Sequence, residues 1–323
     1  MYKLEGSIVL VTGAAGFIAS HLCDSLLLQG ASVIGVDNFL TGSQENLKEA
    51  NQNPKFTFIE GDINNEIFLE ELFAKHTIQY VFHYAAVLGV KRVLEKPLSL
   101  LADIDGFKNL MQQAKKHNIK KVVFASSSEV YGDTRALPLS EDTADVLAWQ
   151  NHETSIYSII KLLGEKIMNA YYTLHGVPTC SLRFFNVFGP RQESSAYGFV
   201  VGVFIKQVIS GKPPTVYGDG YQTRDFIYVK DNVRLAIAAL KTKDSDGEVI
   251  NIGMGRQTTV IDLAERIVRI SEKNLKPVKI DGRKQEIRYR TPDVNKMKRI
   301  LGDEIIDNLD KNLKETYEWY QRQ

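Results

Sequence analysis

The feature that most constrains this chain is a glycine-rich turn near its start. An apolar run, Ile8 to Val11, ends in the sequence Thr12-Gly13-Ala14-Ala15-Gly16, and a helical pattern follows from Ala15 to Gln29. Gly13 allows a tight turn, and Gly16 allows the backbone to approach a pyrophosphate whose charge meets the helix N-terminus. The pattern therefore predicts a strand, a phosphate-binding turn and a helix.

A second apolar run, Ala31 to Val36, follows this helix and ends at Asp37. A carboxylate at this place can bind both hydroxyls of an adenosine ribose, and it would repel a 2′-phosphate. A glycine-rich turn alone is a weak signal, because ordinary strand-turn-helix units also contain one. Together with Asp37 it predicts a dinucleotide-binding fold that takes NAD rather than NADP.

The chain of 323 residues is long enough for one large domain or two modest ones, and 44% of it is hydrophobic. Lys plus Arg total 40 against 39 for Asp plus Glu, which gives a net charge of +1. This balance provides no overall field that would gather nucleic acid or a membrane surface, so local arginines must hold any anionic ligand. We expect no nucleic-acid or membrane partner.

Cysteine usage and the chain start carry less information. Cys23 and Cys180 show no CxxC or metal-ligand spacing, which predicts buried free thiols and no metal site. No apolar run approaches the roughly 18 residues of a membrane span. The first residues, Met1 to Gly6, lack the apolar region of a signal peptide, and the expected location is the cytoplasm.

Short apolar runs alternate with helical patterns through the first half of the chain. The predicted strands are Ser7–Val11, Ser32–Val36, Phe56–Ile59, Tyr80–His83, Val122–Ala125 and Thr179–Phe184. Repeated βαβ units predict an α/β fold of the Rossmann type, a doubly wound parallel sheet with helices on both faces. Because ligands bind at the carboxyl ends of such strands, the motifs that follow them should meet in one crevice.

After Pro190 this alternation breaks up into turns. A helix is predicted from Thr258 to Ser271, where Thr259 and Asp262 are arranged like a capping box. The expected domains are a NAD-binding domain of residues 1–186, to which residues of about 225–253 return, and a smaller substrate-binding α/β lobe made mainly of residues 187–323.

A long helix is predicted from Thr154 to His175, and it carries Tyr157 and Lys161 four residues apart on one face. Its apolar residues recur at spacings of three and four and should form one buried stripe, made of Ile156, Ile160, Leu163, Ile167, Ala170 and Leu174. Tyrosine is a poor base near its free pKa of about 10. A neighbouring lysine and a cationic nicotinamide both favour the phenolate, so the pair predicts a proton acceptor beside NAD. Taken alone, this spacing is usual on solvated helix faces.

The segment Phe124 to Gly132 follows the fifth predicted strand and contains Ser126-Ser127-Ser128-Glu129. A serine at that position can hydrogen-bond a reacting hydroxyl and pass its proton to Tyr157. The alternative is a strand-end turn held by local bonds from side chain to backbone.

In combination, these motifs resemble those of the extended short-chain dehydrogenase/reductases, and in particular the nucleotide-sugar epimerase/dehydratase family. The resemblance covers nearly the whole chain. The matching segments are Thr12–Ile18, Asp37-Asn38, Asp62-Ile63, His83–Ala86, Ser126–Gly132, Tyr157 with Lys161, Arg183–Pro190, Gly218–Asp231 and Arg290–Asp293.

The resemblance implies a role for each matching residue. The candidate catalytic residues are Ser127, Tyr157, Lys161 and Glu129. The implied cofactor-binding residues are Gly13, Ala15, Gly16, Phe17, Ile18, Asp37, Asn38, Asp62, Ile63, Tyr84, Ala85, Ala86, Ser126, Tyr157 and Lys161. The implied substrate-binding residues are Ser127, Ser128, Asn186, Arg224 and Arg290, and the two arginines suit the diphosphate of a nucleotide sugar. Arg191 and Arg288 are interpreted as surface charges.

The family also implies a homodimer that packs two helices of each copy together, here Leu98–His117 and Thr154–His175. Three positions depart from the family pattern. Ala19 replaces the usual third glycine of the first turn, and Phe107 stands where threonine is usual. Asp103 stands where an asparagine usually lies near the cofactor and the catalytic pair, so an acid there could shift a pKa.

The family chemistry begins when Tyr157 takes the proton of a sugar hydroxyl at C4 while a hydride passes to NAD. The 4-keto sugar can then turn over to give a 4-epimer, lose water from C5 and C6, or lose carbon dioxide if C6 is a carboxylate. Ser128 replaces the aspartate of the Asp-Glu pair of dTDP-glucose dehydratases, which weakens the dehydratase interpretation. Ser-Glu does occur in GDP-mannose dehydratases and glucuronate decarboxylases. The Ser-Pro-rich stretch usual in those decarboxylases is replaced by Ala85 to Pro97.

We therefore expect a nucleotide-sugar 4-epimerase, UDP-linked, that recycles its NAD. The alternatives are a 4,6-dehydratase or a UDP-glucuronate decarboxylase that uses Glu129, a net 4-dehydrogenase, and a non-catalytic NAD-binding protein. Glu129 is either a catalytic acid or base or a structural acid at a strand end.

Overall fold

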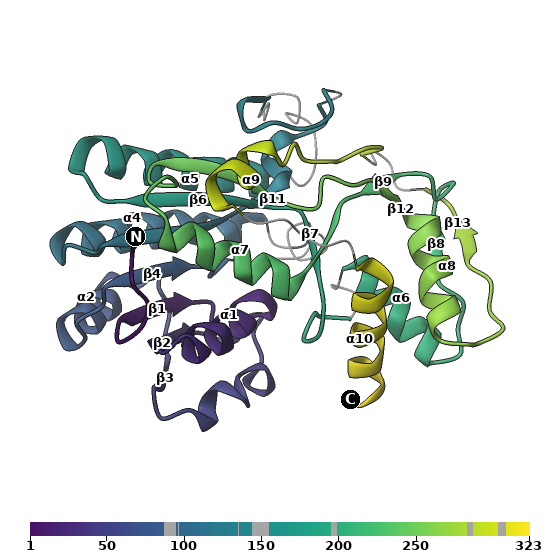
Figure 1. The fold of residues 1–323 in the computed structure, drawn as a ribbon, viewed down its shortest axis with the longest axis horizontal. Helices are drawn as coiled ribbons and strands as arrows, with labels where there is room; N and C mark the ends of the chain where they lie inside the picture. The colour runs from purple at the N-terminus through teal and green to yellow at the C-terminus, as the bar shows by residue number, and fades with distance from the viewer. Residues whose placement is uncertain are drawn as a thin grey trace.

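A seven-stranded parallel sheet lies at the centre of the computed structural model, which describes residues 1–86, 95, 97–134, 136–143, 155–194, 199–282, 287–302 and 308–323 (Figure 1). From edge to edge the strands are β11 (Glu248–Ile252), β6 (Thr179–Phe184), β5 (Lys121–Ser127), β4 (Tyr80–His83), β1 (Ile8–Thr12), β2 (Ser32–Asp37) and β3 (Phe56–Glu60). Every neighbouring pair in this sheet is parallel. The predicted doubly wound α/β fold is confirmed.

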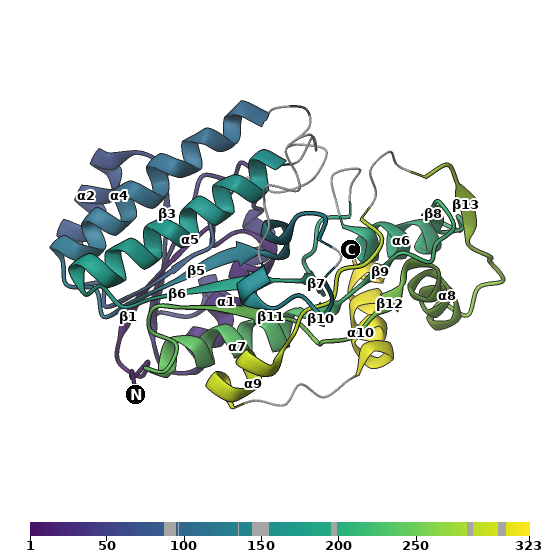
Figure 2. The same cartoon turned by 90° about the horizontal axis from the view of Figure 1, so that it is seen from above.

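Helices cover both faces of the sheet, as Figure 2 shows. One face carries α2 (Glu66–Lys75), α4 (Ala102–Lys116) and α5 (Ser155–His175), and the other carries α1 (Phe17–Leu28), α7 (Val229–Lys241) and α9 (Asn295–Leu301). Hydrophobic clusters fill the space beneath both layers. Because both faces of the central strands are buried, those strands read as continuous apolar runs in the sequence.

The direction in which the sheet grows changes between β1 and β4. The chain runs outward from β1 through β2 to β3, and later from β4 through β5 to β6. In such a sheet a crevice opens at the carboxyl ends of the two central strands. The glycine turn follows β1 and the His83 segment ends β4, so both lie at this crevice.

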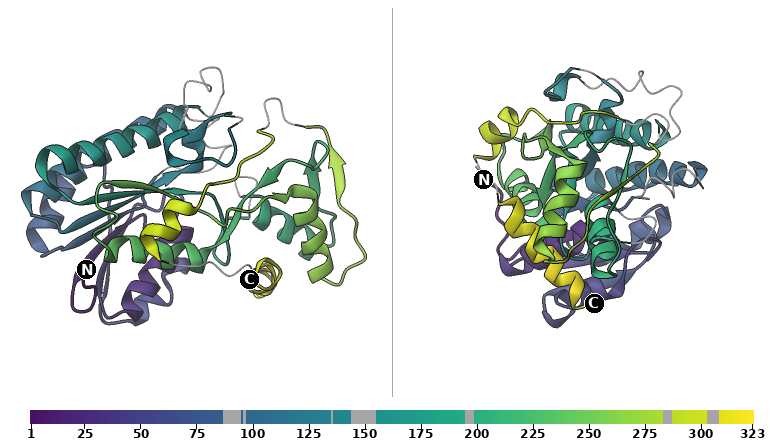
Figure 3. Two further views of the ribbon diagram at one scale, coloured as in Figure 1. Left: turned by 45° about the horizontal axis from the view of Figure 1, so that its top comes forward. Right: turned by 90° about the vertical axis from the view of Figure 1, so that its right-hand side faces the viewer.

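The smaller elements gather beyond the carboxyl edge of the sheet (Figures 1 and 3). They comprise β7 (Asn186–Phe188) paired with β10 (Phe226–Tyr228), β9 (Thr223–Arg224) with β12 (Thr258–Thr259), β8 (Thr215–Tyr217) with β13 (Val278–Ile280), and the helices α6 (Val200–Ile209), α8 (Val260–Ile270) and α10 (Leu309–Gln321). The predicted cap of α8 is confirmed, since the Thr259 hydroxyl accepts a 3.2 Å hydrogen bond from the Asp262 amide. By contrast, β11 is a strand of the large sheet, and α7 packs on one face of that sheet.

Short 3₁₀ segments complete the description. They are Gln44–Leu47, Ala50–Gln52, Pro97–Leu101, Ser128–Tyr131 and Glu141–Thr143. The helix expected from Leu98 to His117 therefore begins as a 3₁₀ turn and continues as α4. Cys23 and Cys180 are free and buried, as predicted.

The expected buried stripe of the helix from Thr154 to His175 is wrong in part. Leu163 and Leu174 are 37% and 75% exposed, whereas Lys161 and Glu165 are buried. The face of α5 that meets β5 and β6 carries polar residues because they bond to those strands. The prediction from hydrophobic spacing therefore selected a neighbouring face of the helix. Thr154 itself lies outside the described residues.

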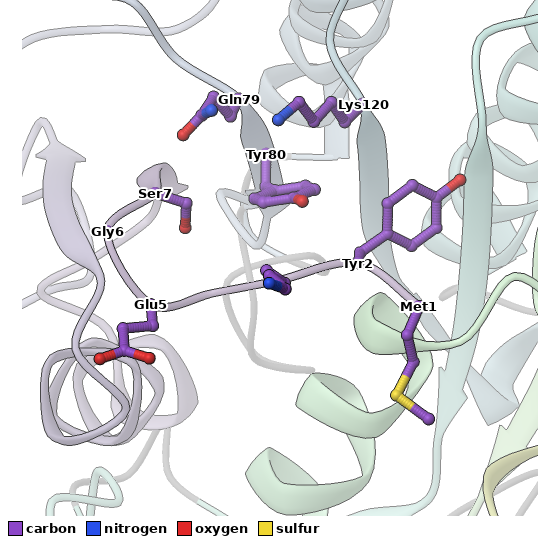
Figure 4. A pocket seen from close by; sticks show the side chains of 9 residues that line it. Met1, Tyr2, Glu5, Gly6, Ser7, Gln79, Tyr80 and Lys120 are labelled. Atoms are coloured by element: carbon purple, nitrogen blue, oxygen red, sulfur yellow. The ribbon is translucent and has the colours of Figure 1, made fainter.

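A separate hollow of about 360 Å³ lies at the opposite, amino-terminal edge of the sheet (Figure 4). Tyr2, Tyr80 and Lys120 border it where the N-terminal segment crosses the starts of β4 and β5. The hollow therefore lies away from every predicted site residue. In the described part of the chain, no helix has both the length and the apolar character that a membrane span needs.

Candidate active site

A cavity of about 580 Å³ opens at the carboxyl ends of the strands and brings together motifs from the whole first half of the chain. The predicted site residues that line it are Gly13, Gly16, Phe17, Ile18, Asp37, Asn38, Asp62, Ile63, Tyr84, Ala85, Ala86, Ser126, Ser127, Ser128, Glu129, Tyr157, Lys161 and Asn186. Ala15, Arg224 and Arg290 are not among its described lining residues.

The glycine turn closes on the loop after β4. Gly13 has a φ of +70°, and a Cβ atom there would lie 2.8 Å from the Ala85 nitrogen and 2.9 Å from the Ala85 Cα. Only glycine fits such a conformation so close to another backbone. Thr12 holds the two loops together, because its hydroxyl accepts hydrogen bonds from the amides of Tyr84 and Ala85, each 3.1 Å long.

The N-terminus of helix α1 faces the cavity, and Gly16 is the residue before its first turn. That turn contains no acidic residue. A helix N-terminus without a competing carboxylate favours a bound anion such as a pyrophosphate. Ala15 contributes through its backbone, since its amide donates a 3.0 Å hydrogen bond to the Asp37 carboxylate.

Asp37 ends β2 and is buried at the rim of the cavity. Its carboxylate also accepts a 2.7 Å hydrogen bond from the Phe39 amide. Burial raises the pKa of this carboxyl, and the backbone hydrogen bonds oppose the rise by stabilising the charged form. The residues after Asp37 fold back over the turn, where the Asn46 amide group donates to the Ala15 carbonyl at 2.8 Å. Sequence reasoning missed Ser43 and Asn46 as lining residues, because only tertiary folding brings this loop to the cavity.

The residues predicted to transfer a proton, Ser127, Tyr157 and Lys161, line the same cavity. The hydroxyl groups of Ser127 and Tyr157 are hydrogen-bonded to each other. The Lys161 ammonium donates a 2.9 Å hydrogen bond to the Ala125 carbonyl and lies 5.9 Å from the centre of the Tyr157 ring. Ser127 also accepts a 3.1 Å hydrogen bond from the Glu129 amide, as the turn interpretation of this serine expects, and its catalytic role stays a prediction.

Burial dominates the pKa values of this pair. It raises the pKa of Tyr157, and the charges of Glu129 and Asp103 raise it further, while the hydrogen bond with Ser127 lowers it. Burial also lowers the pKa of Lys161 to about 8, against the attraction of Asp103 and Glu165. Burial therefore shifts each group toward its neutral form relative to water, and a cationic ligand beside the pair would shift Tyr157 toward its phenolate.

Glu129 lines the cavity, and its carboxylate forms an ion pair with the Arg290 guanidinium. Arg290 is buried and also donates a 3.1 Å hydrogen bond to the Gly132 carbonyl. It therefore contacts the segment Ser126–Gly132, which carries the candidate catalytic residues Ser127 and Glu129. Arg224 donates to the Thr223 carbonyl at 2.8 Å.

The interpretation of Arg191 as a surface charge is wrong. Its side chain is only 10% exposed, lines the cavity and pairs with Asp24 at 2.7 Å. Arg288 is half-exposed and pairs with Asp219 at 2.8 Å, as expected of a surface residue.

A buried polar network supports the segment Ser126–Gly132. The Glu165 carboxylate accepts hydrogen bonds of 2.9 and 2.8 Å from Arg183 and one of 2.5 Å from the Ser126 hydroxyl. Arg183 in turn donates to the Tyr131 hydroxyl at 3.0 Å, and Tyr131 donates to Asn251 at 2.6 Å. Sequence reasoning missed Glu165 as a partner of Ser126, although it follows Lys161 by four residues and therefore shares its helix face.

The residues of the cavity fit an extended dinucleotide. A carboxylate at the end of β2, an unopposed helix N-terminus and a Tyr-Lys pair mark three successive places along it. These places match an adenosine ribose, a pyrophosphate and a nicotinamide ribose.

Comparison with known proteins supports this assignment. A model of the NAD dependent epimerase/dehydratase family matches residues 9–253. The UDP-N-acetyl-alpha-D-glucosaminuronate decarboxylase of Bacillus cytotoxicus is 37% identical over 96% of this chain and 97% of its own length. A crystal structure of the UDP-glucose 4-epimerase of Thermotoga maritima with UDP-glucose superposes with a TM-score of 0.90, at 34% identity and coverage of 98% and 99%.

The UDP-glucuronic acid 4-epimerase of Bacillus cereus, solved with UDP-glucuronic acid and NAD, superposes with a TM-score of 0.86, at 32% identity and coverage of 98% and 99%. These relatives are enzymes, which sets aside the alternative of a non-catalytic NAD-binding protein. The chain therefore belongs to the NAD-dependent epimerase/dehydratase family and is an enzyme that uses NAD.

Proposed function

We propose that this enzyme is a UDP-sugar 4-epimerase that recycles its NAD. The observation that carries the proposal is the ion pair between Glu129 and Arg290, beside a complete set of Ser127, Tyr157 and Lys161. This arrangement provides the groups for oxidation at C4. The Glu129 carboxylate, which a second proton transfer at C5 would use, is already engaged in the ion pair.

Bound NAD would supply the acceptor and donor of the hydride. Tyr157 takes the proton of the C4 hydroxyl, directly or through the Ser127 hydroxyl to which it is hydrogen-bonded. The Lys161 ammonium, fixed by the Ala125 carbonyl, favours the phenolate form of Tyr157. The 4-keto sugar then turns over before reduction, so that the hydride returns to the other face of C4.

A dehydratase needs a base that removes the C5 proton. Glu129 is the residue that would act as this base, but the guanidinium of Arg290 is bound to one of its carboxylate oxygens. A carboxylate bound in this way is a weak proton acceptor. Epimerisation requires no such step, which is why we rank it above dehydration.

Decarboxylation is the second candidate. A 4-keto uronic acid loses carbon dioxide without a base at C5, so the Glu129–Arg290 pair does not oppose this reaction. The 37% identity with a UDP-N-acetylglucosaminuronate decarboxylase favours it specifically. The two candidates differ in substrate, because only decarboxylation requires a C6 carboxylate.

One NMR experiment separates these reactions. The enzyme is incubated in deuterated water with UDP-glucose, UDP-N-acetylglucosamine, UDP-glucuronate and UDP-N-acetylglucosaminuronate. We expect a 4-epimer that carries no deuterium at C5.

Release of carbon dioxide with a pentose product would establish the decarboxylase, and deuterium at C5 with loss of water would establish the dehydratase. Accumulation of a keto sugar with stoichiometric NADH would indicate a net dehydrogenase. Tyr157→Phe, which should keep NAD bound and lose turnover, is the control.

We also propose a homodimer. Leu98 and Leu101, next to the start of α4, and Ile159 and Leu163 on α5 are exposed apolar side chains. Helices α4 and α5 lie side by side on one face of the sheet (Figure 2). A second copy of this chain that packs the same two helices against them would bury this surface.

A further inference from the structure

Residues 189–193 follow β7 and lead into the smaller lobe. Arg191, Gln192 and Glu193 in this segment line the same cavity as Phe17, the first residue of α1. The segment is therefore one wall of the cavity that fits the dinucleotide. Whatever holds this wall in place also keeps the cavity closed around a bound cofactor.

One face of α1 contacts this segment through two side chains. His21 and Asp24 lie four and seven residues after Phe17, so the three side chains share a face of the helix. The His21 Nε2 atom lies 2.9 Å from the Pro190 carbonyl oxygen and donates the hydrogen bond, since a carbonyl can only accept. The Asp24 carboxylate forms an ion pair of 2.7 Å with the Arg191 guanidinium. The segment is therefore fixed to the helix whose N-terminus faces the cavity.

The ion pair between Asp24 and Arg191 is largely shielded from water. The two side chains are 19% and 10% exposed, so salt and solvent screen the pair much less than they screen a pair on the surface. Arg191 has a second contact, 3.4 Å from the Glu49 carboxylate, but that side chain is 75% exposed and the contact contributes little. The position of the Arg191 side chain therefore depends mainly on Asp24.

The backbone of the segment is also held from the smaller lobe. Arg191 has a φ of +67°, in the left-handed region that a residue other than glycine adopts only where the surrounding contacts hold it. At the next residue, the Tyr320 hydroxyl of α10 donates a hydrogen bond to the Gln192 carbonyl. Contacts with α1 and with α10 therefore meet at two consecutive residues that line the cavity.

We propose that His21, Asp24 and Arg191 form a brace that keeps residues 189–193 against α1 and thereby slows the release of NAD. They are positioning residues, which act through the segment rather than by contact with the cofactor. Loss of the Arg191 guanidinium would free the segment to move away from α1 and open the cavity beside this helix. Because the brace concerns NAD alone, it would act in the same way in an epimerase, a decarboxylase or a dehydratase.

The test compares Arg191→Met with Arg288→Met. Methionine keeps much of the apolar stem of arginine and removes the guanidinium, and Arg288 is a half-exposed arginine that pairs with Asp219 at 2.8 Å. Each protein is loaded with radiolabelled NAD and diluted into excess unlabelled NAD, and the loss of label gives the dissociation rate. We expect release to be about tenfold faster in Arg191→Met and unchanged in Arg288→Met. Equal rates in the wild type and in Arg191→Met would overturn the proposal.

A double variant separates the brace from stability alone. Arg191→Met leaves the Asp24 carboxylate unpaired, which by itself destabilises the protein. The variant Asp24→Asn/Arg191→Met removes both charges, so it should recover part of the lost Tm and still release NAD as fast as Arg191→Met. A double variant that releases NAD at the wild-type rate would show that the unpaired charge, and not the lost brace, caused the effect.

Two single variants complete the test. Arg191→Lys keeps a positive charge for Asp24 and should keep release close to the wild-type rate, whereas release as fast as in Arg191→Met would contradict the role of the ion pair. His21→Leu removes the hydrogen bond to Pro190 without leaving a buried charge, and it should also speed release. An unchanged rate in His21→Leu would contradict the brace as defined. None of these readouts uses sugar turnover, so failure of the epimerase proposal would be visible separately.

Discussion

Gly13 illustrates how a single residue was predictable and why. The sequence order of strand, turn, helix and acid identified it, because the turn is local and its chemistry is general. The pairing of Glu129 with Arg290 was not predictable, since it joins residues 161 positions apart. Arg290 was expected at the diphosphate of the substrate, and that role stays a prediction, while in the structure its guanidinium contacts Glu129 and the Gly132 carbonyl.

Replacing Gly13 by alanine should damage both the fold and the cofactor site. The new Cβ would meet the Ala85 backbone at 2.8 Å in a residue with positive φ. We expect Tm to fall by about 5 °C or more and NAD to be lost from the purified protein. Thermal unfolding and quantitation of nucleotide released by acid would measure both effects.

Gly176 provides the matched control. It has a φ of +67°, and no atom of the described residues lies within 4 Å of the place that a Cβ would take. Gly176→Ala should therefore show only the conformational penalty, about 1–2 kcal/mol, with NAD retained. Equal losses of NAD in the two variants would mean that crowding at Ala85 is not the cause.

At the scale of elements, α5 shows where sequence patterns stop being informative. Its length and its Tyr157–Lys161 face could be predicted, but its buried stripe could not. Burial there is decided by polar partners on other strands, since Glu165 bonds to Arg183 on β6 and Ser126 on β5. Hydrophobic spacing carries no information about such partners, and it assigned the exposed Leu174 to the core.

This network makes a prediction for Glu165. Glu165→Ala would leave the buried guanidinium of Arg183 without its carboxylate, so we expect a loss of about 3–5 kcal/mol in the free energy of unfolding. Glu165→Gln keeps one acceptor and should lose less. Urea unfolding followed by circular dichroism would measure both, with the exposed neighbour Lys166→Ala as control. A Glu165→Ala enzyme as stable as the control would show that the network does not hold α5 to the sheet.

At the scale of the whole molecule, the parallel sheet and its crevice followed from the alternation of strands and helices. The first strands were placed within two residues of their observed bounds, because each is a short apolar run and all of them except the edge strand β3 are buried on both faces. The lobe beyond the carboxyl edge was less predictable. Its sheets are two-stranded and its strands are as short as two residues, so they leave almost no periodic signal.

The last prediction concerns the apolar surface of α4 and α5. If a second copy covers it, the protein should have about twice the 36.4 kDa mass of one chain in light scattering. Leu163→Glu places a charge on this surface and should give a monomer, because a buried unpaired carboxylate costs several kcal/mol. Leu28→Glu is the control, since Leu28 is 88% exposed on α1, on the other face of the sheet. A wild-type monomer, or equal dissociation of the Leu28→Glu protein, would show that this helical surface is not the dimer interface. A Leu163→Glu monomer that retains NAD would further show that the cavity is complete within one chain.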